Sequence, residues 1–136
     1  MMAAVMAAGG FASGAMAAQP ATAAQPYVRI AELEIDPQQL SAYKTILATE
    51  QEASVRGEPG VIMLHSVAIA DHPNQIRLLE VYASRAAYEA HVKAPHFLRY
   101  KTLTATMVVS LKLLDTMPIL LCAKDGRGAQ GSVACQ

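Results

Sequence analysis

The chain has 136 residues, 53% of them hydrophobic, and its 11 basic residues balance its 11 acidic residues to a formal net charge of zero. This length and composition predict one domain with enough apolar residues for a core. A neutral chain without a block of lysines and arginines lacks the electrostatic footprint of proteins that bind nucleic acid or anionic membranes, so we expect neither partner.

Residues 1–26 differ in composition from the rest of the chain, because they are mainly Ala, Met and Gly and contain no charged residue. Small residues at 15–17 and 21–23 resemble signal-peptide cleavage sites. We therefore predict a secretory signal peptide and a periplasmic or secreted protein. The segment has no basic start, which leaves open a disordered leader on a cytoplasmic protein. Glycines interrupt the apolar run, so we do not expect it to span a membrane.

The first half of the remaining chain predicts a strand followed by a helix. Apolar and polar residues alternate over 27–35, which is typical of a strand with one buried face. Asp36 can cap a helix and Pro37 suits its first position. The helix is expected to end at 57–60, with Glu50 facing solvent.

The second half predicts two strands joined by a hairpin, then an interrupted helix and a last strand. We expect the strands at 60–70, 76–82 and 107–115. Ser84 is placed to cap the helix. Pro95 interrupts that helix, because a residue before proline avoids helical backbone angles.

This order of elements, β-α-β-β-α-β, predicts an α+β, ferredoxin-like domain over 27–121, an antiparallel sheet with its helices on one face. The other sheet face would carry Val28, Ile30 and the apolar second strand. Because so large an apolar surface is unusual on a monomer, we predict a homodimer that packs sheet against sheet.

A C-terminal segment, 122–136, is expected to be a flexible tail, since it is rich in Gly, Ala, Gln and Ser. It contains the only two cysteines, Cys122 and Cys135. They could form a disulfide in an oxidising compartment or remain free thiols, and the sequence does not decide between these alternatives.

Side chains able to hold or move protons are concentrated between residues 76 and 100. Glu80 and Tyr82 share one face of the predicted strand, and His91 follows Tyr88 by three residues, which places both rings on one helical face. We expect Glu80 to hydrogen-bond His91 between helix and sheet. Such a pair could act as a catalytic base or only fix the helix in place.

Several short motifs resemble the antibiotic biosynthesis monooxygenase (ABM) family, including its quinol-monooxygenase-like members. They are Glu58-Pro59-Gly60, the stretches 79–84 and 87–91, and Pro95-His96-Phe97, and the resemblance covers about 27–114. It implies a dimeric α+β barrel that oxygenates quinol or phenolic substrates with molecular oxygen and without metal, flavin or haem. Some relatives degrade haem instead. Family members often have Trp where this chain has Tyr82, which leaves the substrate open.

Cofactor-free oxygenation requires a base that takes the substrate proton and a site that shields the resulting anion from water. We predict His91 and Glu80 as the catalytic residues. Tyr82, Tyr88, His65 and Phe97 are predicted to bind the substrate, although His65 could instead be a core residue.

The four histidines are spread along the sequence without a metal-binding spacing, so we predict no metal site. The alternative function is a non-catalytic dimeric barrel that binds a small apolar ligand.

Overall fold

The computed structural model describes residues 24–124 and 133–135. Its main sheet has four strands in the order β2-β3-β1-β4, and every neighbouring pair is antiparallel. The strands are β1 (Tyr27–Ile35), β2 (Val61–Ile69), β3 (His72–Tyr82) and β4 (Val108–Asp115). This arrangement confirms the predicted ferredoxin-like fold.

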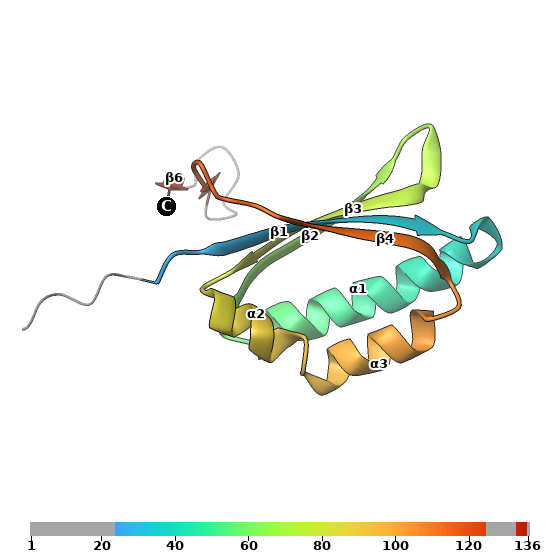
Figure 1. Cartoon of the computed structure of the whole chain (residues 1–136), viewed down its shortest axis with the longest axis horizontal. Coiled ribbons are helices and arrows are strands. Elements are labelled where there is room, and N and C mark those ends of the chain that lie inside the picture. Colours follow the sequence, from blue (N-terminus) through green and yellow to red (C-terminus); the bar gives the residue numbers. More distant parts are fainter. Residues whose placement is uncertain (1–23, 125–132, 136) are drawn as a thin grey trace, which may run out of the picture.

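Three α-helices cover one face of the sheet (Figure 1). They are α1 (Leu40–Gly57), which follows the short 3₁₀ helix η1 (Pro37–Gln39), α2 (Arg85–His91) and α3 (Pro95–Thr104). The helix starts lie where the sequence predicts them. The Asp36 carboxylate accepts a hydrogen bond from the Gln38 amide, and Ser84 Oγ accepts one from the Ala87 amide.

Helix α1 contacts the sheet through a stripe of buried residues, Tyr43, Leu47, Glu50 and Ser54. These positions recur every three to four residues, which is the spacing of one helical face. The prediction that Glu50 faces solvent is therefore wrong, since its spacing from Leu47 places it on the buried stripe.

The core lies between the helices and the inward-facing residues of β1 and β3. Ala31, Leu33 and Ile35 pack there with residues of α1 and α3. The hydroxyl groups of Tyr43 and Tyr100 are 2.7 Å apart, which joins α1 to α3 by a buried hydrogen bond. This pairing satisfies two polar groups that would be costly to bury alone.

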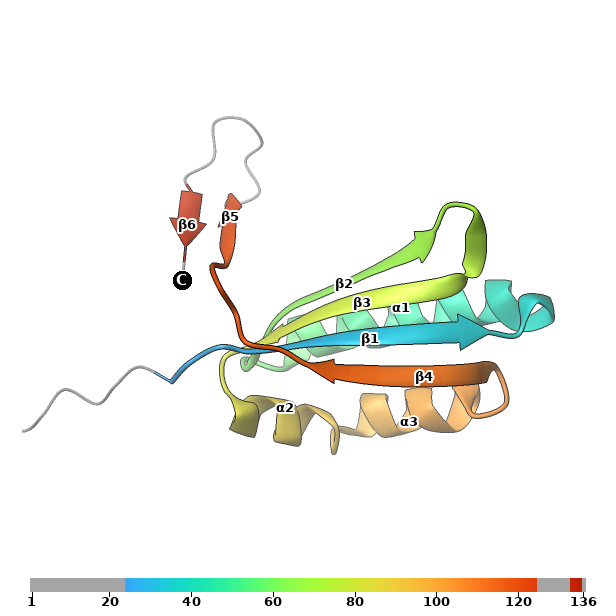
Figure 2. The same ribbon diagram turned by 45° about the horizontal axis from the view of Figure 1, so that its top comes forward.

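On the opposite face of the sheet, one row of residues crosses all four strands. His65, Leu79, Ile30 and Leu114 are register partners in that order. In Figure 2 no helix of the described chain lies over this face. Leu79 is 39% exposed, so a large apolar side chain remains in contact with solvent in the monomer.

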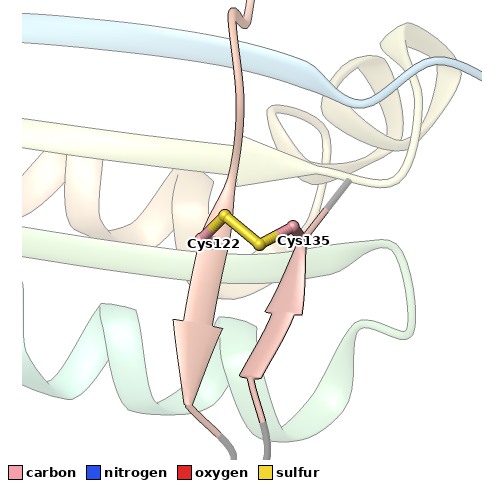
Figure 3. The surroundings of a disulfide bond; sticks show 2 residues. All are labelled: Cys122 and Cys135. Carbon is pink, nitrogen blue, oxygen red and sulfur yellow. A yellow bond between two sulfur atoms is a disulfide. The ribbon is translucent and has the colours of Figure 1, made fainter.

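A second, two-stranded sheet lies near the C-terminus. Strands β5 (Cys122–Lys124) and β6 (Val133–Cys135) pair antiparallel, with Cys122 opposite Cys135. A disulfide bond joins these two residues (Figure 3), which selects one of the two alternatives that the sequence leaves open. The flexibility expected of the segment 122–136 stays a prediction.

The predicted leader lies almost entirely outside the described residues, so cleavage and export remain predictions. Among the residues that the structure does describe, no helix has both the length and the apolar character needed to cross a bilayer.

Candidate functional site

A cavity of about 100 Å³ lies between the sheet and the three helices. The sheet contributes Arg29, Glu80 and Tyr82 to its wall, and the helices contribute Tyr88 and His91 among others. On one side the wall is formed by edge strand β4, whose Leu111 and Leu113 are 43% and 46% exposed. The cavity wall is therefore accessible to solvent on this side.

Five of the six predicted site residues line this cavity. They are Glu80, Tyr82, Tyr88, His91 and Phe97. The structure thus brings together one strand and two helices that are separate in sequence, at the place the sequence predicts.

The sixth residue, His65, is outside the cavity, so its predicted roles in substrate binding or the core are wrong. Successive residues of a strand point to opposite faces. Leu64 lines the cavity, and His65 is consequently exposed on the other face, opposite Leu79.

His91 is 3% exposed and hydrogen-bonds Glu58, not Glu80. Its Nδ1 lies 2.9 Å from Glu58 Oε1, whereas Glu80 Oε2 accepts a hydrogen bond of 3.1 Å from the Tyr82 hydroxyl. The predicted His91–Glu80 hydrogen bond is therefore wrong.

The close packing of the α1–β2 connection against α2 explains this pairing. A Cβ atom on Gly60 would lie only 2.5 Å from the Ala87 Cβ, so α2 approaches the start of β2 to a distance that only glycine allows. Glu58, two residues before Gly60, is thereby brought beside the last residue of α2.

The carboxylate of Glu58 is shared by two histidines, because His96 Nε2 lies 2.5 Å from the same Oε1 atom. Burial alone would raise the pKa of Glu58, but the hydrogen bonds from His91 and His96 outweigh it, and the net shift of its pKa is downward. An ionised carboxylate only accepts hydrogen bonds. Both imidazole nitrogens that face it therefore carry protons, and a neutral His91 has its lone pair on Nε2.

Glu50 lies on the other side of the His91 ring. Its Oε1 is 3.8 Å from His91 Nε2 and accepts a hydrogen bond of 2.6 Å from Ser54 Oγ. Glu50 is only 7% exposed. His91 therefore lies between two carboxylates, one bonded to Nδ1 and one facing Nε2.

A row of polar residues forms the sheet side of the cavity. Arg29 is the register partner of both Glu80 and Asp115. Its Nη1 donates a hydrogen bond to the Tyr88 hydroxyl, and its Nε lies 3.3 Å from Asp115 Oδ1 without the alignment of a hydrogen bond. Arg29 is 8% exposed, so a largely buried cation lies in the sheet side of the cavity wall.

Burial raises the pKa of Glu80, although the hydrogen bond from Tyr82 and the charges of His91 and Arg29 partly oppose this shift. A carboxyl with a raised pKa in the folded state loses folding stability as the pH rises through that pKa.

We therefore expect Glu80→Gln to raise Tm by a few degrees at about pH 8, because the amide removes a buried charge and can still accept from Tyr82. This gain in Tm should disappear below pH 4.5, which is the ordinary pKa of a glutamate side chain. Thermal unfolding of the wild type and Glu80→Gln across this pH range measures the difference in Tm. A lower Tm for the variant at about pH 8 would contradict the prediction.

A family model for antibiotic biosynthesis monooxygenases matches residues 26–103. The chain belongs to the antibiotic biosynthesis monooxygenase family. The match spans β1 through most of α3. It includes every residue named above that lines the cavity, except those of β4.

Solved structures agree with this ABM membership. A candidate antibiotic biosynthesis monooxygenase from Bacteroides thetaiotaomicron is 43% identical, with a TM-score of 0.69 over 70% of this chain and 90% of that one. A counterpart from Nitrosomonas europaea is 25% identical, with a TM-score of 0.67 over 71% of this chain and 92% of that one.

A candidate monooxygenase from Lactobacillus acidophilus is 32% identical, with a TM-score of 0.64 over 68% of this chain but only 45% of that one. No curated protein sequence matches the chain.

Three functional candidates of this ABM domain were not predicted from sequence. They are Glu50, Glu58 and His96. Of the described residues, Glu50, His91 and His96 form a group that could hold a metal ion, because each offers one ligand atom and these atoms lie within 4.8 Å of one another. The spacing of histidines along the sequence does not reveal this group, because the corner before α3 brings His96 back toward His91.

Proposed function

We propose that this chain is a cofactor-independent monooxygenase that oxidises a small quinol or phenolic compound with molecular oxygen. The observation that carries the proposal is His91, a buried imidazole at the cavity wall whose Nδ1 is held by Glu58. That bond leaves Nε2 as the atom that takes a proton.

Deprotonation is the step for which this site is suited. A quinol gives electrons to oxygen readily only as its anion, so the reaction starts when His91 Nε2 takes the hydroxyl proton. One oxygen atom then enters the ring and the other leaves as water. The substrate supplies all the electrons, because the quinol is oxidised to a hydroxyquinone (quinol + O₂ → hydroxyquinone + H₂O). No redox cofactor is required for this balance.

The residues around His91 fit the roles that this reaction needs. Glu58 fixes the ring orientation and the tautomer, and Glu50 at 3.8 Å stabilises the imidazolium that forms. Arg29 also lines the cavity, where its charge favours a substrate anion. Phe97 packs on His91 with ring centroids 4.8 Å apart and keeps water from that side.

The size of the cavity supports a single-ring substrate. An apolar cavity of roughly 150 Å³ holds one benzene molecule. This cavity is smaller, at about 100 Å³, so even a single ring fits only if it extends through the open side at β4. A monocyclic quinol whose substituent extends past Leu111 and Leu113 is the substrate class we propose.

Incubation of the full chain with quinols under ¹⁸O₂ tests this proposal. The product should contain one labelled oxygen atom, as shown by mass spectrometry. A ligand that binds tightly but is recovered unchanged would overturn the proposal and support the non-catalytic binding module.

We further propose that the protein is a homodimer formed through the sheet face that carries Ile30 and Leu79. Replacing Leu79 with lysine places a charge at the centre of this apolar row, which is costly in a buried interface. Light scattering on the full chain should give about twice the 14.4 kDa chain mass for the wild type and the monomer mass for Leu79→Lys.

Leu98 of α3 provides the matched control, since it is 52% exposed on a helix and away from this face. Leu98→Lys should remain dimeric. A monomeric wild type, or dissociation of the Leu98 variant alone, would contradict the sheet-to-sheet interface.

Export to an oxidising compartment is also part of the proposal. The Cys122–Cys135 disulfide supports it, because such bonds are rare where thiols are kept reduced. The mass of the protein recovered from the periplasm or medium should show loss of the leader. Recovery of the full-length chain from the cytoplasm alone would contradict export.

A further inference from the structure

The corner between α1, β2, α2 and α3 gathers two imidazoles and two carboxylates. Glu58 Oε1 lies 2.9 Å from His91 Nδ1 and 2.5 Å from His96 Nε2. Glu50 Oε1 lies 3.8 Å from the other nitrogen of His91. Three further potential ligands therefore lie around the His91 ring, although they come from separate segments of the chain.

Burial makes this group unusual. The side chains of Glu50 and Glu58 are only 7% and 16% exposed, and that of His91 is 4% exposed. Two carboxylates removed from water need compensating positive charge, because an uncompensated buried charge is strongly destabilising. One divalent cation bound beside the imidazoles would supply such a charge.

We propose that this corner binds one divalent transition-metal ion of the Zn²⁺ type through Glu50, His91 and His96. Their ligand atoms lie within 4.8 Å of one another, and a contraction to about 3.4 Å gives tetrahedral zinc geometry. Glu58 would not bind the ion. It would keep its hydrogen bond with His91 Nδ1, as carboxylates commonly orient metal-binding histidines.

The donor set determines which ions fit. Imidazole and carboxylate suit zinc, manganese or iron(II), whereas magnesium and calcium prefer sites made of oxygen ligands alone. His96 has to turn away from Glu58 to reach the ion, and its side chain, which is 28% exposed, has room to do so. Three protein ligands would leave the fourth tetrahedral position for water.

Isothermal titration of metal-free full chain with ZnCl₂ tests this inference, and MgCl₂ serves as the comparison ion. We expect one equivalent of Zn²⁺ to bind and no comparable signal for Mg²⁺. Zn²⁺ binding should be lost in His96→Gln. In Glu58→Gln the affinity should fall about 10- to 100-fold, the loss typical when the carboxylate that orients a metal-binding histidine is removed. Circular dichroism verifies that both variants are folded.

The two remaining histidines of the chain give the matched control. His65 and His72 are exposed and lie outside this group. The double variant His65→Gln/His72→Gln should bind Zn²⁺ as the wild type does. Absence of binding in the wild type, or loss of binding in this control with retention in His96→Gln, would overturn the inference.

One consequence rests on the proposed function. An ion on His91 occupies the nitrogen that acts as the base, so Zn²⁺ should inhibit oxygen uptake and a chelator should restore it. The titration uses no substrate and therefore tests the metal site even if the oxygenase proposal fails. Stoichiometric binding without inhibition would overturn only the link between the ion and the base.

Discussion

Replacing His91 with glutamine lowers kcat/KM for quinol oxidation by about 10²- to 10⁴-fold, the usual contribution of a general base. Glutamine is close in length to histidine and can donate a hydrogen bond to Glu58 from its amide nitrogen. It cannot take a proton, so the substrate anion does not form in the site. Initial rates of oxygen consumption for the purified variant measure this effect.

Comparing His91→Gln with glutamine variants of two glutamates shows whether the geometry around His91 determines the rate. Glu58→Gln should lower kcat by about 10-fold, because it weakens the control of ring orientation. Glu80→Gln should have a smaller effect, since Glu80 bonds Tyr82 and not His91. A loss in Glu80→Gln equal to that in His91→Gln would show that Glu80, not Glu58, works with the base.

Replacing Gly60 with alanine destabilises the fold by about 1–3 kcal/mol, the range for inserting a group into a closely packed site. The new Cβ would lie 2.5 Å from the Ala87 Cβ, and neither atom belongs to a flexible side chain. Helix α2 must therefore move, and it carries Tyr88 and His91. We expect a lower midpoint in urea unfolding and a fall in quinol oxidation.

Two further variants separate this clash from other effects of alanine. Ala87→Gly in the Gly60→Ala background removes the opposing methyl group, so it should restore much of the lost activity. Gly57→Ala is the matched control, because nothing lies within 4 Å of its added Cβ. If Gly57→Ala is as destabilising as Gly60→Ala, close packing against α2 is not the reason that a glycine precedes β2.

The fold was predictable because the signals that determine it are local. Alternation over Tyr27–Ile35 defines a strand with one buried face, and Asp36 and Ser84 lie at helix starts as capping residues. Once the order of strands and helices is known, few arrangements of the sheet remain.

Glu50 could have been found from sequence as well. It lies three residues after Leu47 and seven after Tyr43, so it belongs to the same helical face. A charged residue within a buried stripe indicates a partner in the interior. Here Ser54 donates a hydrogen bond to Glu50, and His91 Nε2 lies 3.8 Å from it.

The pairing of His91 was beyond sequence reasoning because it depends on packing between distant segments. Glu58 is 33 residues from His91 and 38 residues from His96. Their meeting results from the close approach of β2 and α2 at Gly60, which no local pattern specifies. The position of His65 likewise depends on the register of β2, since a shift of one residue would turn it into the cavity.

Oxygen uptake by the full chain with a panel of monocyclic quinols, in the presence of a chelator, tests the central claim most directly. We predict uptake with at least one quinol for the wild type, loss of that uptake in His91→Gln, and retention in His65→Gln. No uptake with any quinol, or equal rates in the wild type and His91→Gln, would contradict the claim that His91 is the base of a cofactor-independent oxygenase.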